Sequence, residues 1–158
     1  MQRVLVTGGT GFLGSSLVKR ILNNQEVEYV VVPTTNIKSK TSIDLMGIKS
    51  DRLNLIGGDV RDYDFVQRMF NEYEFDTIFH LGAMSEVRKC QSNAKLAYDT
   101  NIGGTINLLE TARMSEGISA IIVSSSDKAY AAVNFPTQKR TLWTEKEYMR
   151  YLSRVRTW

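Results

Sequence analysis

The sequence predicts an α/β fold, in which helices cover both faces of a doubly wound parallel sheet of about five strands. Short runs of β-branched and apolar residues alternate with segments of helical periodicity. A glycine-rich turn follows the first run, and polar residues follow the later ones. The 158 residues, of which 42% are hydrophobic, suffice for one domain with a buried core. The pattern predicts the strand order 3-2-1-4-5 with right-handed crossovers.

The first strand and the first helix are joined by the glycine-rich turn. Residues 4–6 predict a buried strand, and residues 15–22 are apolar at helical spacing. Gly8 and Gly11 would let the backbone turn tightly and approach a pyrophosphate, and Gly14 would let the helix pack close to the strand. Glycine triplets also occur in ordinary turns, but the strand–turn–helix context favours a dinucleotide site. Its expected residues are Gly8, Thr10, Gly11, Phe12, Leu13 and Gly14.

Residues 28–32 predict a second buried strand, closed by Pro33. A carboxylate that binds the adenosine ribose is expected about 20 residues after the glycine turn, but residues 34–40 contain none. Thr35 and Lys38 are the expected cofactor contacts here, and Lys38 with Lys40 could accommodate a 2′-phosphate. The sequence therefore indicates NAD or NADP, with a slight preference for NADP. Equally, both lysines could be solvated loop residues.

Residues 53–56 predict a third strand, which two aspartates follow. Asp59, beside Val60, stands where the ligands of open parallel sheets collect, and it could accept a hydrogen bond from the adenine amino group. Asp62 is instead expected to cap the next helix, whose residues 65–70 carry an apolar face.

Residues 77–81 predict a fourth strand, and small residues at its end would let a flat cofactor lie against the backbone. The expected contacts are Leu81, Gly82, Ala83 and Ser85. For His80, the only histidine, a structural role is favoured over a catalytic one. A long helix is expected over residues 94–114, although Thr100, Asn101 and a glycine pair interrupt its pattern. Each glycine inside a helix costs about 1 kcal/mol of stability relative to alanine. We therefore expect another part of the structure to approach the helix closely here, with Thr100 on the cofactor side.

Residues 120–124 predict the fifth strand, after which a hydroxyl, a carboxylate and an ammonium group stand side by side. Ser124 is an expected cofactor contact, and Ser126, Asp127 and Lys128 are the candidate catalytic residues. The carboxyl end of a central strand is where chemistry beside a bound nicotinamide would occur. Composition alone equally allows a polar strand-to-loop connection without a catalytic role, in which Asp127 caps the next turn.

Composition argues against several other classes of protein. Cys90 is the only cysteine, so no internal disulfide is possible, and no Cys/His cluster indicates a metal site. The net charge of +3 comes from residues 135–158, and a basic tail alone is a poor basis for nucleic-acid binding. There is no apolar run of membrane-spanning length and no leader sequence, so we expect a cytoplasmic protein without a membrane partner.

Five segments together resemble the NAD(P)-dependent sugar-nucleotide epimerase/dehydratase family of extended short-chain dehydrogenases/reductases. They are TGGTGFLG (7–14), GDVRD (58–62), FHLGA (79–83), TNIGGT (100–105) and SSSDKAY (124–130), within a likeness that covers residues 3–130. The resemblance implies a Rossmann-like NAD(P)-binding domain over residues 1–130, a nucleotide-sugar substrate and a homodimer. The Ser-Asp-Lys element is most similar to that of the CDP-glucose 4,6-dehydratases.

The resemblance also implies a reaction. Hydride would leave sugar C4 for the nicotinamide, water would be eliminated across C5 and C6, and the hydride would return to C6. Ser126 would then bind the C4 hydroxyl, Asp127 would protonate the departing C6 hydroxyl, and Lys128 would assist removal of the C5 proton. Asp127 would need a raised pKa for this role, which a dry pocket favours and a charged Lys128 opposes.

Residues 131–158 depart from the family pattern. The family's Tyr-x-x-x-Lys pair is absent, because Tyr130, Tyr148 and Tyr151 are followed four places later by Asn134, Leu152 and Val155. We therefore expect a truncated chain without the substrate-binding part and with much of the dimer interface missing, and impaired catalysis. The alternative is a non-catalytic dinucleotide-binding module whose tail binds a partner.

A frameshift near residue 130 would explain this tail. Reading the codons of residues 135–158 from their third base permits a family-like sequence, including Tyr-x-x-x-Lys with its tyrosine codon spanning Tyr148 and Met149. The pair Trp143-Thr144 forces an aspartate in that frame, which fits the pattern. Sequencing the coding DNA should reveal codons compatible with this second frame. Incompatible codons would contradict the hypothesis.

Overall fold

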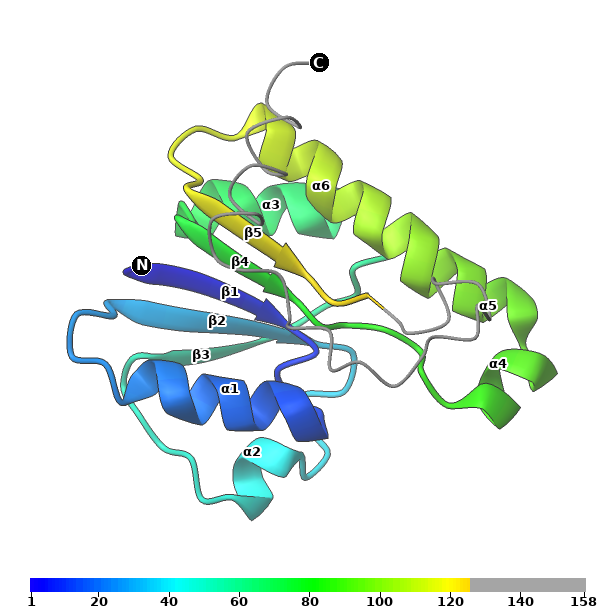
Figure 1. Cartoon of the computed structure of the whole chain (residues 1–158), viewed down its shortest axis with the longest axis horizontal. Helices are drawn as coiled ribbons and strands as arrows, with labels where there is room; N and C mark the ends of the chain where they lie inside the picture. Colours follow the sequence, from blue (N-terminus) through cyan, green and yellow to red (C-terminus); the bar gives the residue numbers. More distant parts are fainter. Residues whose placement is uncertain (126–158) are drawn as a thin grey trace, which may run out of the picture. The chain divides into compact units, whose positions relative to one another are not determined.

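Five parallel strands form one sheet in the computed structural model, which describes residues 1–125. The order is β3-β2-β1-β4-β5, as the sequence predicts, with the first strand at the centre (Figure 1). The strands are β1 (Arg3–Thr7), β2 (Tyr29–Thr34), β3 (Leu53–Gly57), β4 (Thr77–His80) and β5 (Ala120–Val123). The predicted domain boundary after residue 130 lies outside the described residues.

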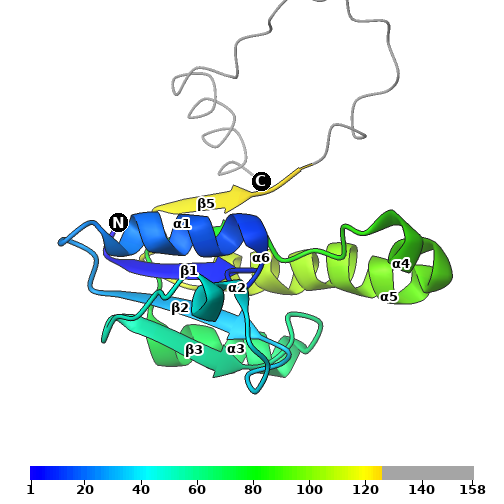
Figure 2. The ribbon, with the colours of Figure 1, turned by 90° about the horizontal axis from the view of Figure 1, so that it is seen from below.

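Helices cover both faces of this sheet, with α1 on one face and α3 and α6 on the other (Figures 1 and 2). Their bounds are α1 (Phe12–Leu22), α2 (Ser42–Leu45), α3 (Tyr63–Tyr73), α4 (Val87–Ser92), α5 (Ala94–Tyr98), the π-helical turn η1 (Asp99–Gly103) and α6 (Gly104–Met114). The single helix expected over residues 94–114 is therefore three elements. The π turn coincides with the Thr100, Asn101 and Gly103 interruption.

Two hydrophobic cores lie on opposite faces of the sheet, because side chains alternate along each strand. Val4, Val6 and Val32 pack with Val18 of α1 in one core. Leu5, Val31 and Ile78 pack with α3 and α6 in the other. All these side chains are fully buried. A parallel sheet needs this cover on both faces, which explains why its strands are continuously apolar.

The second strand continues through Pro33, which sequence reasoning took as its end. Pro33 pairs with Ile56 of β3, whereas the last pair between β1 and β2 is Leu5 with Val31. Pro33 has no N–H to donate, and it stands just after the last β1–β2 pair, where that ladder ends.

Side chains close the ends of several elements. Asp62 caps α3 as expected, with its carboxylate accepting from the Phe65 amide at 3.0 Å. The Arg52 guanidinium donates to the carbonyls of Leu22, Asn24 and Val27, and so satisfies acceptors at and beyond the end of α1. Within the described residues, no helix is both long and apolar enough to cross a membrane.

Asp76 joins the beginnings of three neighbouring strands. Its carboxylate accepts from the amides of Gln2 and Arg3 and from the Thr77 hydroxyl, and its carbonyl accepts from the Ser119 amide before β5. Burial opposes ionisation of Asp76, but the hydrogen bonds outweigh it and lower the pKa of its carboxyl below 3.8.

We expect Asp76→Ala to lower the free energy of unfolding by about 2 kcal/mol, because three donors lose a charged acceptor. Since the folded-state pKa is depressed, this stabilisation is complete above the unfolded pKa. It is lost as pH falls below 3.8 toward the folded value. Urea unfolding followed by circular dichroism, once well above pH 3.8 and once below it, measures both effects. The exposed control Glu116→Ala should change stability by less than about 0.5 kcal/mol at either pH, and an equal loss in both variants would contradict the assignment.

Candidate functional site

The glycine turn after β1 packs directly against the end of β4. Gly8 has φ +69°, which L side chains rarely adopt, and a Cβ there would lie 2.7 Å from the Gly82 nitrogen and the Leu81 carbonyl carbon. A Cβ at Gly14 would lie 2.1 Å from the Gly8 carbonyl oxygen, so α1 abuts the turn more closely than the strand. The turn is closed by the Gly11 amide, which donates to the Gly8 carbonyl at 3.0 Å.

The first turn of α1 presents amide groups without a capping side chain. Gly11 is its N-cap residue, no side chain accepts from the turn, and the turn contains no acidic residue. Phe12 and Leu13 are 90% and 66% exposed. Because the first N–H groups of a helix have no acceptor within the helix, this end favours a bound anion such as a pyrophosphate.

The expected ribose site is a hollow beside the end of β2. It is lined by Thr34, Ile37, Lys38, Ser39, Lys40, Thr41, Asp44 and Leu55, and the Ser42 amide links it to the glycine turn by donating to the Thr10 carbonyl. Thr35 follows β2 directly but does not line the hollow. The only carboxylate that lines it, on Asp44, accepts from the amide and hydroxyl of Thr41, and these bonds lower its pKa.

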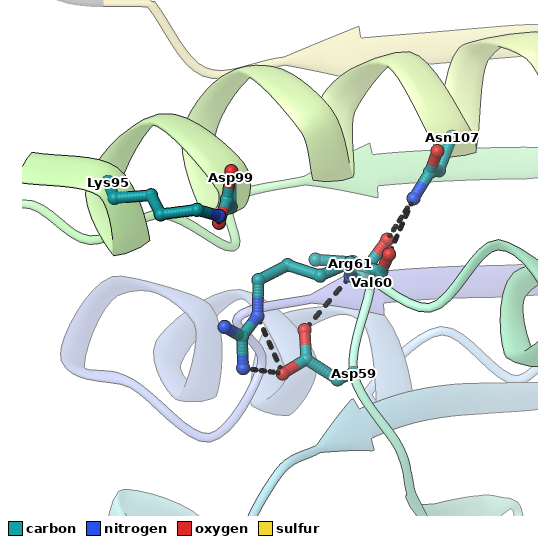
Figure 3. A network of polar contacts seen from close by, with 6 residues as sticks. All are labelled: Asp59, Val60, Arg61, Lys95, Asp99 and Asn107. Carbon is teal, nitrogen blue, oxygen red and sulfur yellow. Dashed lines mark hydrogen bonds and ion pairs between the residues drawn. The ribbon is translucent and has the colours of Figure 1, made fainter.

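Asp59 lies after β3 and is held by Arg61, a partner that sequence reasoning missed. One carboxylate oxygen accepts from the Arg61 amide at 2.9 Å, and the other accepts from Nε and Nη2 of its guanidinium (Figure 3). The Arg61 side chain lowers the Asp59 pKa, although partial burial opposes this. The first oxygen keeps a free lone pair, which an adenine amino group could use.

The loop after Asp59 is anchored to α6. Asn107 donates from Nδ2 to the carbonyls of Val60 and Arg61, each at 3.0 Å (Figure 3). A Cβ at Gly104 would lie 2.7 Å from Cγ2 of Val60. Gly104 therefore permits the close approach that the sequence predicted for the glycine pair, although the neighbour is a protein loop.

The loop after β4 is bound to the π turn. The Asn101 side chain accepts from the Met84 amide at 2.7 Å and donates to the Met84 carbonyl at 3.0 Å. Gly82 lies against Thr7, whereas Ala83 and Ser85 are exposed. Thr100 lies within the π turn itself. Sequence reasoning noticed Asn101 only as a helix interruption, and that interruption was the available signal.

The sequence-predicted residues thus collect at the carboxyl edge of the sheet, where all parallel strands end. Ser124 follows β5 there, with its amide donating to the His80 carbonyl at 3.0 Å. The candidate catalytic residues Ser126, Asp127 and Lys128 lie outside the described residues. Within residues 1–125, no group of three His, Cys, Asp or Glu side chains is arranged to hold a metal ion.

A doubly wound parallel sheet with a glycine turn at its carboxyl edge is a Rossmann-like fold. A family model described as GDP-mannose 4,6 dehydratase matches residues 5–147. The chain is 33% identical over 130 residues to CDP-paratose 2-epimerase from Salmonella typhi, covering 82% of this chain and 38% of that relative. It belongs to the NAD-dependent epimerase/dehydratase family of short-chain dehydrogenases/reductases.

Solved structures agree with this assignment. A dTDP-glucose 4,6-dehydratase from Streptomyces venezuelae, with NAD and TYD bound, has a TM-score of 0.66 and 30% identity over 76% of this chain and 38% of its own. A UDP-glucose 4-epimerase from Thermotoga maritima, with UDP-glucose, has a TM-score of 0.67 and 27% identity over 78% of this chain and 37% of its own. The chain thus spans less than half the length of these proteins.

We expect Gly8→Ala to weaken dinucleotide binding about a hundredfold, because the new methyl group pushes the turn away from Leu81 and Gly82. Gly117→Ala is the matched control, since Gly117 has φ +82° but a Cβ there would meet nothing within 4 Å. It should cost about 1–2 kcal/mol of stability and leave binding unchanged. Fluorescence titration with NADH and NADPH measures the affinities, and circular dichroism checks folding. We call the glycine turn (residues 8–11), together with the loop 81–84 after β4, the dinucleotide cradle. Wild-type affinity in Gly8→Ala would contradict this assignment.

Proposed function

We propose that this chain binds NAD(P) at the carboxyl edge of its sheet and derives from a nucleotide-sugar 4,6-dehydratase. The contact between Gly8 and the Leu81–Gly82 backbone carries the proposal, because it holds the glycine turn and the uncapped start of α1 beside the loop after β4, where a pyrophosphate would meet free amide groups. Family membership supports the same cofactor class, since a dehydratase of similar structure contains NAD.

The slight preference for NADP has support in the ribose hollow. Lys38 and Lys40 both line it, and its only carboxylate is engaged by Thr41 in a capping box. A 2′-phosphate in the hollow would meet two cations, whereas the one carboxylate that lines it already accepts two hydrogen bonds from Thr41 on one of its oxygens.

The chemistry proposed for the site is the dehydration of a hexose attached to a nucleotide. A bound nicotinamide would supply the acceptor for hydride from sugar C4 and the donor that returns it at C6. Ser126 would orient the C4 hydroxyl, whose proton the tyrosine of the missing Tyr-x-x-x-Lys pair accepts in the family, Asp127 would donate a proton to the C6 hydroxyl as it leaves as water, and Lys128 would assist removal of the C5 proton. The Ser-Asp-Lys element favours a CDP-hexose, and the homodimer of the family stays a prediction.

Turnover by this chain should be strongly reduced, because no tyrosine in its 158 residues is followed four places later by lysine. A missing general base typically costs about 10²–10⁴ in rate. Rapid conversion of a CDP- or dTDP-hexose would contradict this part of the proposal. Binding without turnover is also what a non-catalytic binding module would show, and the second reading frame argues against that alternative because it explains the tail without a partner.

Separate titrations with NAD(H) and NADP(H), by calorimetry and fluorescence, test the proposal. We expect both to bind, with NADPH tighter. Replacing both lysines (Lys38→Ala with Lys40→Ala) should weaken NADPH binding about tenfold and leave NADH binding unchanged. The control Lys49→Ala replaces an exposed lysine outside the hollow and should change neither affinity. No dinucleotide binding by the folded chain would refute the proposed function, and equal losses for both cofactors would refute the 2′-phosphate assignment.

A further inference from the structure

His80 connects three elements at the centre of the cofactor edge. It ends β4, is 3% exposed, and uses both nitrogens of its ring. Nδ1 lies 2.6 Å from the Thr7 hydroxyl at the end of β1, and Nε2 lies 2.9 Å from the Thr105 hydroxyl near the start of α6. The ring therefore bridges the two central strands and the helix that covers them.

The neighbouring hydrogen bonds decide where the ring carries its proton. Thr105 gives its single hydroxyl proton to the Asn101 carbonyl at 2.7 Å, so it can only accept from Nε2–H. Thr7 accepts from the Gly82 amide at 3.0 Å and keeps its proton to donate to Nδ1. Burial lowers the pKa of His80 below 6.5, which favours the neutral ring. The network thus assigns a neutral imidazole with its proton on Nε2.

These bonds form a closed circuit that begins and ends in one loop. From Gly82 the circuit passes to Thr7, His80, Thr105 and Asn101, whose side chain binds both backbone groups of Met84. The loop 81–84 is therefore held at Leu81, whose amide donates to the Thr7 carbonyl at 3.2 Å, and at Gly82 and Met84 through this circuit, in which the imidazole is the central link. Among the described residues, every buried side-chain nitrogen and oxygen has a partner.

We propose that His80 is a positioning residue that fixes loop 81–84, the wall of the dinucleotide cradle, by linking Thr7 to Thr105. This rests on the proposed function, because the loop matters to binding only if the cradle holds a cofactor. A doubly protonated ring would leave the Thr7 hydroxyl proton without an acceptor, because Nδ1–H and the Gly82 amide would then both donate to the Thr7 oxygen.

The protonation state can be read directly, because His80 is the only histidine in the chain. Nitrogen NMR of uniformly labelled protein should show one imidazole with a protonated Nε2 and a bare Nδ1 at neutral pH. Burial places the midpoint of its titration below pH 6.5. A proton on Nδ1, or an ordinary titration, would overturn the assigned network.

Two matched valine variants test the positioning role. Thr105→Val removes the acceptor of Nε2–H without changing side-chain size. Thr111→Val removes the same kind of bond within α6, from its hydroxyl to the Asn107 carbonyl at 2.8 Å, without touching His80. We expect Thr105→Val to speed hydrogen exchange at the Gly82 and Met84 amides and to weaken dinucleotide binding, each about tenfold. Thr111→Val should do neither, and Thr105→Ser should restore both.

Exchange and binding together decide the proposal. If Thr105→Val and Thr111→Val leave exchange at Gly82 and Met84 equally unchanged, the circuit does not hold the loop. If exchange rises but affinity does not fall, the loop is not the wall of the cradle. Both results overturn the proposal. If the wild-type chain binds no dinucleotide, the proposed function fails by itself, and the exchange rates still decide whether His80 positions the loop.

Discussion

A side chain at position 8 would place its Cβ 2.7 Å from two backbone atoms of the neighbouring strand end. This contact between main chains brings the glycine turn against the loop after β4, just beyond the last pair of β1 with β4. The Gly11 amide closes the turn onto the Gly8 carbonyl, and α1 starts against the same carbonyl through Gly14. Glycine is needed at positions 8 and 14 for lack of space, and at position 8 also for its dihedral angle.

Carboxylates near the cradle are each engaged by a neighbouring donor. Asp59 is paired with Arg61, and Asp44 accepts from Thr41. On the adjoining helix, Lys95 pairs with Asp99, and the charge of Asp99 also helps to raise the pKa of Arg61 (Figure 3). A ligand with several negative charges therefore approaches an edge where these three carboxylates are each held by a neighbouring cation or hydrogen-bond donor, which reduces their repulsion of the ligand.

The sequence was sufficient for the strand order, the glycine turn and the Asp62 cap, because each depends on local periodicity or on a short motif. It was insufficient for the hydrogen bonds that join distant segments. The link from Thr7 to His80 spans 73 positions, and that from Val60 to Asn107 spans 47. Such pairs leave no periodic trace in one sequence. The helix interruption at Asn101 was visible, but its partner Met84 was not.

The pairing of β1 with β4 joins Val4 to Thr77 and Thr7 to His80. During synthesis from the amino terminus, β1, α1, β2 and β3 can assemble first, since their contacts lie within the first 57 residues. The second wall of the cradle exists only after β4 and its loop have left the ribosome. The surroundings of the glycine turn are therefore complete only after residues 77–84 have been synthesised.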